Sequence, residues 1–512
     1  MYILIRNRHI YKEVNMVTRK KLFVFITFMV FLTSLSLANG FYLSSLGTKA
    51  TSMGGAFIGL ANDYSAIFWN PAGLSLFKSP ILGLYGVDII PKMKYWNYKL
   101  CAPCSGICPK CTPELWVDTA TKNKNYFSGL VSFYYPLNDK IVAGLGVYAP
   151  SSLGAQWNGA DFQKMFTAGT SYLGPYNLES QIHMVTISPA IALKLSQVFS
   201  LGVTLNFNYA SMDTESWGGV LYGPTAPGAV FTKAWDTGQF SQQINGWGFG
   251  TTVGVLASPL KWLSVGGTMR LSSTIKFKGT ATMQNINAIP FKTVADVPTS
   301  SDVAVNFTPP TWAGLGIALK PSENLILTAD VQWTNWKKLD VLGYTYNDKW
   351  TAAFAEDLAI CSGIKANTHS YLPHAFLNRN GQFRWENTVQ YRGGIEYKTG
   401  KIAWRAGYYH DSSPAPDQTL NVLLPSFDLS SFTVGFGIPL GKFEIDFGLE
   451  ILKGKQRIIP FGINDPSFPD VVQNPDAEAN YDPAYASVMP GTYSISVIAP
   501  TVSIVYRFGP KK

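Results

Sequence analysis

The residues with the most evident chemistry are four cysteines in one short run. They form two Cys-x-x-Cys pairs, Cys101 with Cys104 and Cys108 with Cys111, that are separated by only three residues. Zinc ribbons place their pairs much further apart, and iron–sulfur proteins use other spacings. Disulfides persist in exported proteins, and an N-terminal signal peptide predicts that this chain is exported. We therefore predict two local disulfides rather than a metal site, and no cofactor, with Cys361 left over.

Side chains that could act as a catalytic nucleophile with its base are few. The chain has five histidines, and His410-Asp411-Ser412 is the stretch that sets one close to an acid and a hydroxyl. Adjacent residues of a strand point to opposite faces, so this stretch does not form a catalytic pair. The sequence also contains no nucleophile elbow and no carboxylate pair in a supporting context. We predict that the chain is not an enzyme.

Three arginines are the candidate cations for binding a ligand: Arg270, Arg392 and Arg405. Alternation along their segments places them on polar faces, together with Lys276. The acidic residues expected on the same faces are Asp330, Glu396, Glu444 and Asp446. Buried charge is costly unless it is paired. These arginines therefore either contact an anionic headgroup or belong to a salt-bridged network, and the sequence leaves both readings open.

The segments that carry these residues alternate in character. In 443–451 every odd position is apolar and every even position is acidic or glycine, and 201–209 and 263–271 alternate in a similar way. A two-sheet sandwich could produce part of this pattern, but the polar faces are too rich in glycine and small residues for a solvated surface. A membrane barrel turns its apolar face to lipid and satisfies every backbone group by closure. Fourteen such segments, joined alternately by short and long connections, predict an all-β, 14-stranded antiparallel transmembrane β-barrel.

Composition and an export signal agree with this fold. Charged residues are 14% of the 512 residues, aromatic residues are also 14%, and the body holds no run of eighteen apolar residues. The apolar run 22–37 follows Arg19-Lys20-Lys21 and ends in small residues, which predicts a signal peptide over 1–38, with 1–15 as a start-site extension. An uncleaved anchor is the alternative. Residues 1–38 hold six basic residues and one acidic residue, so +4 of the net charge of +9 stays on the mature chain, and no nucleic-acid partner is indicated.

Between the signal and the first strand lies a glycine-rich stretch, 39–79, that contains Asn70-Pro71-Ala72. It has too many glycines for a good helix and no long alternating run, so we expect a compact plug. The stretch resembles the FadL/TodX (OMPP1) family of outer-membrane transporters for long-chain fatty acids and aromatic hydrocarbons, in which an N-terminal hatch with an Asn-Pro-Ala motif closes the barrel. Further stretches resemble the family in the same order: 145–150, 308–316, 329–336, 385–387, 405–408 and 411–417.

The resemblance implies domains and a mechanism. It implies a hatch over 39–79, a barrel over 80–508 and a short tail over 509–512, in the bacterial outer membrane. A long-chain fatty acid or similar hydrophobic molecule would be captured by extracellular loops, enter an interior pocket and leave sideways into lipid. The hatch gate would involve Phe41, Asn70, Pro71 and Ala72. A non-selective or structural porin-like barrel is the alternative, and a self-contained barrel of either kind would be a monomer.

Two further sets of residues are implied in this path. A kinked third strand, expected over 140–150, would form the lateral exit at Gly144, Gly146 and Pro150, although the glycines could instead merely relieve crowding. The apolar loop 151–179 is the candidate for first capture, through Trp157, Phe162 and Phe166, because exposed apolar patches often mark binding surfaces. The same loop could instead pack its own small core.

Overall fold

The computed structural model describes most of the chain. The described residues are 43–99, 114–162, 174, 176–217, 220–224, 231–236, 238–284, 298–347, 380–460 and 489–509. The predicted signal peptide, Phe41, Phe166, Cys361 and the four clustered cysteines lie outside these residues. None of the helices in the described part of the chain is long and apolar enough to cross a membrane.

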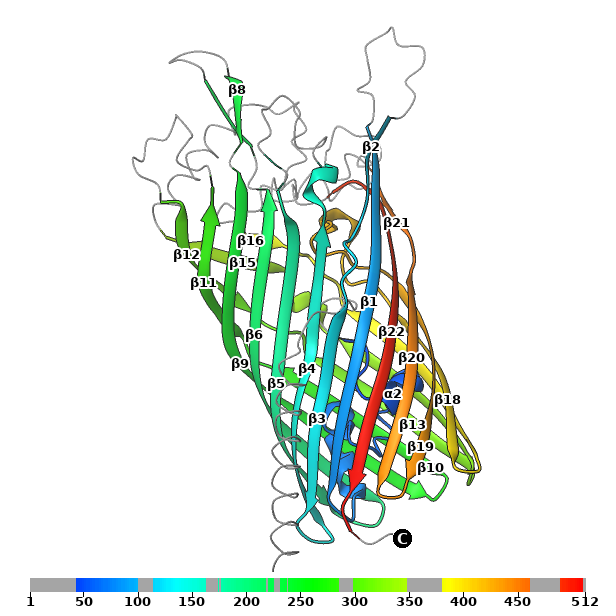
Figure 1. Ribbon diagram of the computed structural model, residues 1–512. Helices are drawn as coiled ribbons and strands as arrows, with labels where there is room; N and C mark the ends of the chain where they lie inside the picture. Colours follow the sequence, from blue (N-terminus) through cyan, green and yellow to red (C-terminus); the bar gives the residue numbers. More distant parts are fainter. Residues whose placement is uncertain are drawn as a thin grey trace, which may run out of the picture.

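Fourteen antiparallel spans close into a barrel, which confirms the predicted fold class (Figure 1). The spans are β1 (Ile81–Lys99), β3 (Tyr126–Pro136), β4 (Ile141–Trp157), β5 (Leu178–Lys194), β6 (Phe199–Trp217), β9 (Gln239–Leu260), β10 (Leu263–Ser272) with β11 (Ile275–Met283), β12 (Ser300–Phe307) with β13 (Trp312–Ser322), β14 (Leu325–Thr334) with β15 (Val341–Tyr346), β16 (Asn380–Gln382) with β17 (Thr388–Thr399), β18 (Ile402–Asp411), β19 (Leu429–Leu440), β20 (Phe443–Gly454) with β21 (Arg457–Ile459), and β22 (Gly491–Arg507). The first and last strands pair from Ile81–Arg507 to Trp96–Thr492, and this pairing closes the sheet.

Short elements extend the barrel beyond its wall. β2 (Glu114–Ala120) pairs with the far end of β1, and β7 (Val220–Pro224) pairs with β8 (Phe231–Asp236) in a separate hairpin. Two short 3₁₀ helices, η2 (Gly159–Phe162) and η5 (Asp417–Thr419), lie in the long connections, and a third, η4 (Trp336–Lys338), interrupts the span between β14 and β15. The far end of β1 is the end with the long connections, whereas the other end has tight turns such as 137–140, 400–401 and 441–442. In bacterial barrels the long loops are extracellular and the short turns periplasmic.

The alternation read from the sequence sets which side chains face out. On β19, Phe432 is 65% exposed and Val434 53%, whereas Thr433 between them is 2% exposed. The apolar outer face and the buried inner face follow from the two-residue period of a strand. Large apolar side chains therefore cover the outside of the barrel, as an apolar solvent requires.

One predicted orientation is wrong. Lys276 was placed on the lumen face by continuing the alternation of β10, but it is exposed on the outer surface, and its neighbours Ile275 and Phe277 are buried. Ser273 and Thr274 interrupt the span between β10 and β11. Across this interruption the register against β9 shifts by one residue, between the pairs Ser272–Gly250 and Lys278–Asn245. A shift of one residue turns every following side chain to the other face, because the period of a strand is two.

Residues 43–79 fill the barrel interior. They form α2 (Thr48–Ser52), α3 (Ala66–Trp69) and the 3₁₀ helix η1 (Pro71–Leu76), joined by turns in which Gly47, Gly54 and Gly55 adopt positive φ. Figure 1 shows this segment, in blue, enclosed by the strands. Nearly every side chain from Leu43 to Leu74 is buried. We name residues 43–79 the hatch.

Candidate functional site

The Asn-Pro-Ala turn fixes the hatch to the wall. The Asn70 side-chain amide donates to the carbonyl oxygens of Ile58, at 3.0 Å, and of Val255 on β9, at 2.9 Å. Its Oδ1 accepts the N–H of Ala72 at 3.1 Å and so caps η1, whose first residue is Pro71. Proline suits that position because it has a preset φ and no N–H to leave unpaired. The motif thus joins two parts of the hatch to one barrel strand.

Other strands hold the same part of the hatch. Asp330 Oδ2 on β14 accepts the N–H of Ile58 at 2.7 Å, and the hydroxyl of Tyr134 on β3 bonds to the carbonyl oxygen of Tyr64. At two glycines the hatch backbone touches the wall. A Cβ at Gly266 would lie 2.1 Å from the carbonyl oxygen of Ile58, and a Cβ at Gly407 would lie 2.1 Å from the nitrogen of Gly54. Lumen glycines therefore let the hatch sit directly against the strands.

Arg405, one of the three candidate arginines, belongs to an ion-pair network. Its Nε lies 2.7 Å from Glu396 and its Nη1 lies 2.6 Å from Asp446, and all three side chains are almost fully buried. Lys49 of the hatch reaches Glu396 at 3.4 Å. Buried charges this close compensate one another. Arg405 therefore ties β17, β18 and β20 together, and through Glu396 it is linked to the hatch.

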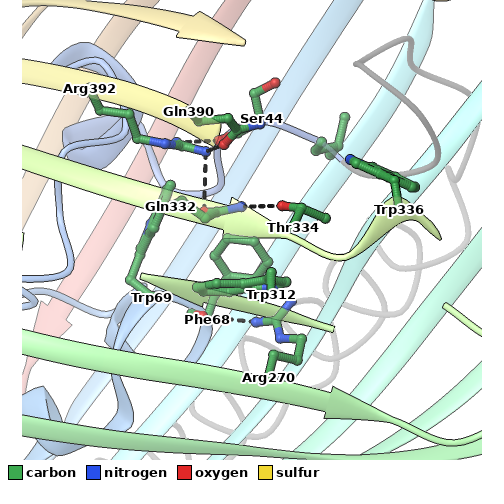
Figure 2. Close-up of a pocket in the computed structure, with 11 residues that line it drawn as sticks. Ser44, Phe68, Trp69, Arg270, Trp312, Gln332, Thr334, Trp336, Gln390 and Arg392 are labelled. Carbon is green, nitrogen blue, oxygen red and sulfur yellow. Dashed lines mark hydrogen bonds between the residues drawn. The ribbon is translucent and has the colours of Figure 1, made fainter. Parts of the chain in front are cut away.

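Arg270 and Arg392 are arranged differently and line one cavity between the hatch and the wall (Figure 2). In the described part of the chain neither guanidinium has a carboxylate within ion-pair distance. Arg270 donates to the carbonyl oxygen of Phe68 at 2.8 Å, and Arg392 donates to that of Ser44 at 2.6 Å. Figure 2 shows both side chains directed toward the hatch from opposite sides of the cavity.

Aromatic rings enclose these two cations. The Cζ atom of Arg270 lies 4.5 Å from the ring centre of Phe68 and 5.0 Å from that of Trp312, and Arg392 lies 5.1 Å from the ring of Trp69. The remaining lining residues are Leu43, Gln332, Thr334, Trp336 and Gln390. Such a cavity pairs apolar walls with a few fixed polar groups, which is the usual composition of a small-molecule site.

The start of the hatch separates this cavity from a second one. Leu43 and Ser44 line both, and the second cavity continues along apolar side chains of β1 and β22 such as Val87 and Ala499. We name residues 43–46 the leader. One hydrogen bond to the wall, from the Leu43 N–H to the carbonyl oxygen of Pro150 at 2.8 Å, and one from Arg392 to Ser44 hold its first two residues.

The leader begins where two wall strands part. The backbones of β3 and β4 pair continuously only from Pro136–Val142 to Leu130–Tyr148, and the next backbone pairing in the described residues is the bridge between Thr121 and Trp157. Between them the Ser128 hydroxyl donates to the carbonyl oxygen of Ala149 at 2.9 Å. Pairing of β4 with β5 also shifts register after Tyr148. The carbonyl of Pro150 is thus turned to the hatch, in a stretch of β4 without its β3 ladder.

The three residues predicted to form the kink of the third strand lie in two different surroundings. Pro150 lies at this irregularity, but Gly144 and Gly146 lie in the regular ladder below it. A Cβ at Gly144 would lie 2.7 Å from Leu74, and one at Gly146 would lie 3.0 Å from Ile67. The expectation that the two glycines bend the strand is therefore wrong, because they make room for the hatch. The strand itself runs to Trp157, seven residues beyond its predicted end.

The predicted capture residues are also placed differently. Trp157 and Phe162 are 1% and 0% exposed, and they pack with Tyr95 in an aromatic cluster. The Trp157 Nε1–H donates to the carbonyl oxygen of Val422 at 2.8 Å. The expectation of an exposed apolar patch is wrong for these two residues, since both are committed to a core inside the long-loop end.

Sequence reasoning missed several residues of the arginine cavity. Trp312 and Gln332 lie in stretches, 308–316 and 329–336, that stand out only through the family resemblance, and no motif in the sequence singles out Gln390 or Ser44. The alternation of side chains along a strand could have identified two of them. Gln332 is two positions from Asp330 and Gln390 is two positions from Arg392, so each pair shares a strand face. Ser44 carried no signal, since its carbonyl and not its side chain makes the contact.

Comparison with known proteins agrees with this architecture. Residues 29–469 match the family model described as outer membrane protein transport protein (OMPP1/FadL/TodX). The chain belongs to this family. It is therefore an outer-membrane channel for hydrophobic compounds and not an enzyme. A search of the curated proteins gives no match.

Solved structures share the fold of this FadL/TodX family member. A Pseudomonas aeruginosa FadL homologue is 16% identical, with a TM-score of 0.68 over 92% of this chain and 100% of that one. The Pseudomonas putida toluene transporter TodX is 16% identical, with a TM-score of 0.60 over 92% of this chain and 100% of that one. The Ralstonia pickettii toluene transporter TbuX is 16% identical, with a TM-score of 0.60 over 91% and 99%.

Proposed function

We propose that this protein takes up long-chain fatty acids or similar amphiphiles that carry an anionic headgroup. The observation that supports this substrate class is the pair Arg270 and Arg392, buried, aimed into one cavity and without an ion-paired carboxylate in the described residues. A substrate carboxylate would supply a direct ion-pair partner at hydrogen-bond distance, and charged hydrogen bonds contribute about 1.5–3 kcal/mol each. The alkyl tail would follow the apolar side of the second cavity, along residues such as Val87 and Ala499 rather than along Glu450, at about 0.8 kcal/mol per buried methylene.

The leader would control passage between these cavities. It lies between the two cavities, and its backbone is bonded to the barrel at Leu43 and Ser44. A carboxylate bound to Arg392 would compete with the Ser44 carbonyl for the same guanidinium. Displacement of the leader would join the cavities and free the carbonyl of Pro150. The substrate would then leave into lipid where β4 lacks its β3 ladder, so that its tail never crosses water.

Entry would begin at the long-loop end, and the rest of the hatch would stay in place as a plug. The hatch (39–79 in full) and the barrel (80–508) would act as one monomeric unit with outer-membrane lipid around it. A filled lumen argues against the alternative of a non-selective porin-like barrel. Steady ion currents through the purified protein in planar bilayers would favour that alternative instead.

The test is uptake of labelled oleate and labelled toluene by cells that lack their own fatty-acid channel and express this protein. We expect Arg392→Met to lower oleate uptake about tenfold or more, to leave toluene uptake unchanged, and to be rescued in part by Arg392→Lys. Arg384→Met, at a half-exposed arginine paired with Asp340, is the control.

Two results would contradict the proposal. Equal loss of oleate and toluene uptake in Arg392→Met would assign Arg392 a structural role only. No oleate uptake by the wild-type protein, with the barrel assembled and toluene transported, would transfer the assignment to neutral hydrocarbons, the compounds named for TodX and TbuX.

A further inference from the structure

The outer surface of the barrel changes abruptly from apolar to basic along three adjacent strands. On β1, β22 and β20, the residues Ile90, Ile498 and Ile451 face outward, are between 39% and 50% exposed, and are direct neighbours across the sheet. Two positions further toward the long-loop end, the neighbours in register are Lys92, Ser496 and Lys453, and all three are exposed. The apolar belt thus ends at one register row.

A second basic row follows the first. Lys94 lies opposite Ser494 and, two positions from Lys92 on β1, points to the same outer face as the first row. Lys455, which follows directly after the end of β20, is also exposed. We name the four residues Lys92, Lys94, Lys453 and Lys455 the lysine rim. Ser494 and Ser496 of β22, the strand between β1 and β20, separate the lysines of β1 from those on and directly after β20, and their side chains are short. Among the described residues, none of the four ammonium groups forms an ion pair.

Position and chemistry together restrict what could bind there. The rim lies just above the apolar belt at the extracellular end, where the headgroups of the outer leaflet meet the protein. Strands are about 4.8 Å apart, so the lysine-bearing strands β1 and β20 lie about 10 Å from each other. Flexible lysine side chains on both sides of a serine strand can reach the phosphates of one large headgroup, as polybasic clusters do at anionic membrane surfaces.

We propose that the lysine rim binds the phosphate groups of the glycolipid that forms the outer leaflet of the outer membrane. The sugar portion would lie over Ser494 and Ser496, and the acyl chains would pack on the isoleucine row beneath. This site is on the outside of the barrel and is independent of the arginine cavity. It would anchor the strands that close the barrel, β1 and β22, in a charged lipid layer.

The matched control is on the same molecule. Lys276 and Lys278 also face outward, but both lie on β11, and their partners in register, Asn306, Ala304 and Asn245, carry no positive charge. The test compares Lys92→Gln/Lys453→Gln with Lys276→Gln/Lys278→Gln in the full-length protein in detergent. Binding of lipopolysaccharide, of the same glycolipid after dephosphorylation, and of inorganic pyrophosphate is measured by titration, and folding is checked by heat-modifiable electrophoretic mobility.

We expect Lys92→Gln/Lys453→Gln to weaken lipopolysaccharide binding at least tenfold and the control to change it less than twofold. Dephosphorylated glycolipid should bind the wild-type protein as weakly as lipopolysaccharide binds the rim variant. Equal effects of the two variants would overturn the proposal, because net charge alone would then explain them. Wild-type binding that does not depend on the phosphates would also overturn it, and pyrophosphate binding as tight as glycolipid binding would replace the lipid by a free phosphate ligand.

Discussion

The two parts of the hatch are held in the barrel in contrasting ways. From Gly54 to Leu74 the hatch touches the wall through its own backbone, through the Asn70 amide and through Asp330 and Tyr134. The leader, residues 43–46, lines cavities on both sides, and within the described part of the chain its backbone bonds to the wall at Leu43 and Ser44. Dense packing with satisfied polar groups raises the cost of local opening, and few contacts lower it.

The arginines show the same contrast. Arg405 is committed to two carboxylates, whereas Arg392 holds a backbone carbonyl of the leader. Removing an ion-pair partner strands buried charge, but replacing a carbonyl by a carboxylate on the same guanidinium strengthens the contact. One arginine is therefore suited to holding the barrel, and the other to exchanging a hatch contact for a ligand.

The largest effect is expected where the hatch backbone meets the wall. Gly407→Val places a side chain 2.1 Å from the Gly54 nitrogen, so the hatch cannot seat. We expect at least a tenfold loss of folded protein in the membrane, or steady ion currents from whatever assembles. Gly86→Val is the control, because a Cβ there has no atom within 4 Å. Normal assembly and closed lumens in Gly407→Val would show that the contact between the hatch backbone and the barrel wall is not rigid.

The next effect separates the arginines. Arg405→Met leaves Glu396 and Asp446 without their shared partner and should cost about 3–5 kcal/mol of stability. Arg392→Met should cost less, because in the described residues no carboxylate lies within ion-pair distance of Arg392, while it reduces oleate uptake. Urea unfolding of both variants in lipid vesicles measures the difference. Equal destabilisation would remove the distinction between the two sites.

A smaller effect is expected from the Asn-Pro-Ala motif. Asn70→Ala leaves the carbonyls of Ile58 and Val255 and the N–H of Ala72 without their partner, at about 1–3 kcal/mol. Asn70→Asp keeps an acceptor for Ala72 but cannot donate to the carbonyls, so it should be no more stable than Asn70→Ala. Recovery of wild-type stability by the aspartate variant would mean that capping η1, and not the wall contact, is what the motif provides.

The smallest effect concerns pH. Burial raises the pKa of Asp63, in the hatch, from 3.8 to about 6, against the opposing effects of its hydrogen bonds with Ser65 and of Lys49. Its stabilising contribution is therefore present below the ordinary pKa and is lost as pH rises through about 6. Between pH 5 and 7 the unfolding temperature of the wild-type protein should fall by about 2–4 °C more than that of Asp63→Asn. Parallel pH profiles would show that this carboxyl does not titrate in the seated hatch.

Much of the barrel could be predicted because the surrounding lipid requires apolar side chains at every second position of each strand. Lipid outside and a filled lumen inside require alternation, so the strands, their number and the inward orientation of Arg270, Arg392 and Arg405 were readable from the sequence. The prediction failed where the period broke. A one-residue shift of register against β9, between β10 and β11, reversed the face of Lys276, and nothing in the local residue types marked that shift.

The alternation of side chains along the strands could not predict what each lumen-facing residue does. Arg392 and Arg405 share a face and a residue type, and what distinguishes them is which strands and which hatch atoms lie opposite. Likewise, Trp157 and Phe162 have the composition of a binding patch, but packing against a distant segment that includes Val422 buried them. Contacts between segments far apart in the chain decide such roles.

The most direct test of the contrast within the hatch is hydrogen–deuterium exchange of the protein in lipid nanodiscs, with and without oleate. We expect oleate to speed exchange in the peptide that covers Leu43–Leu46 by about tenfold or more, because the Leu43 amide loses its hydrogen bond to Pro150 and the buried amides that follow it become accessible to water. The peptide covering Ile58–Leu74 should exchange equally slowly in both conditions. Faster exchange in both peptides together would contradict the account, since the hatch would then move as one body, and no change in either would mean that oleate does not displace the leader.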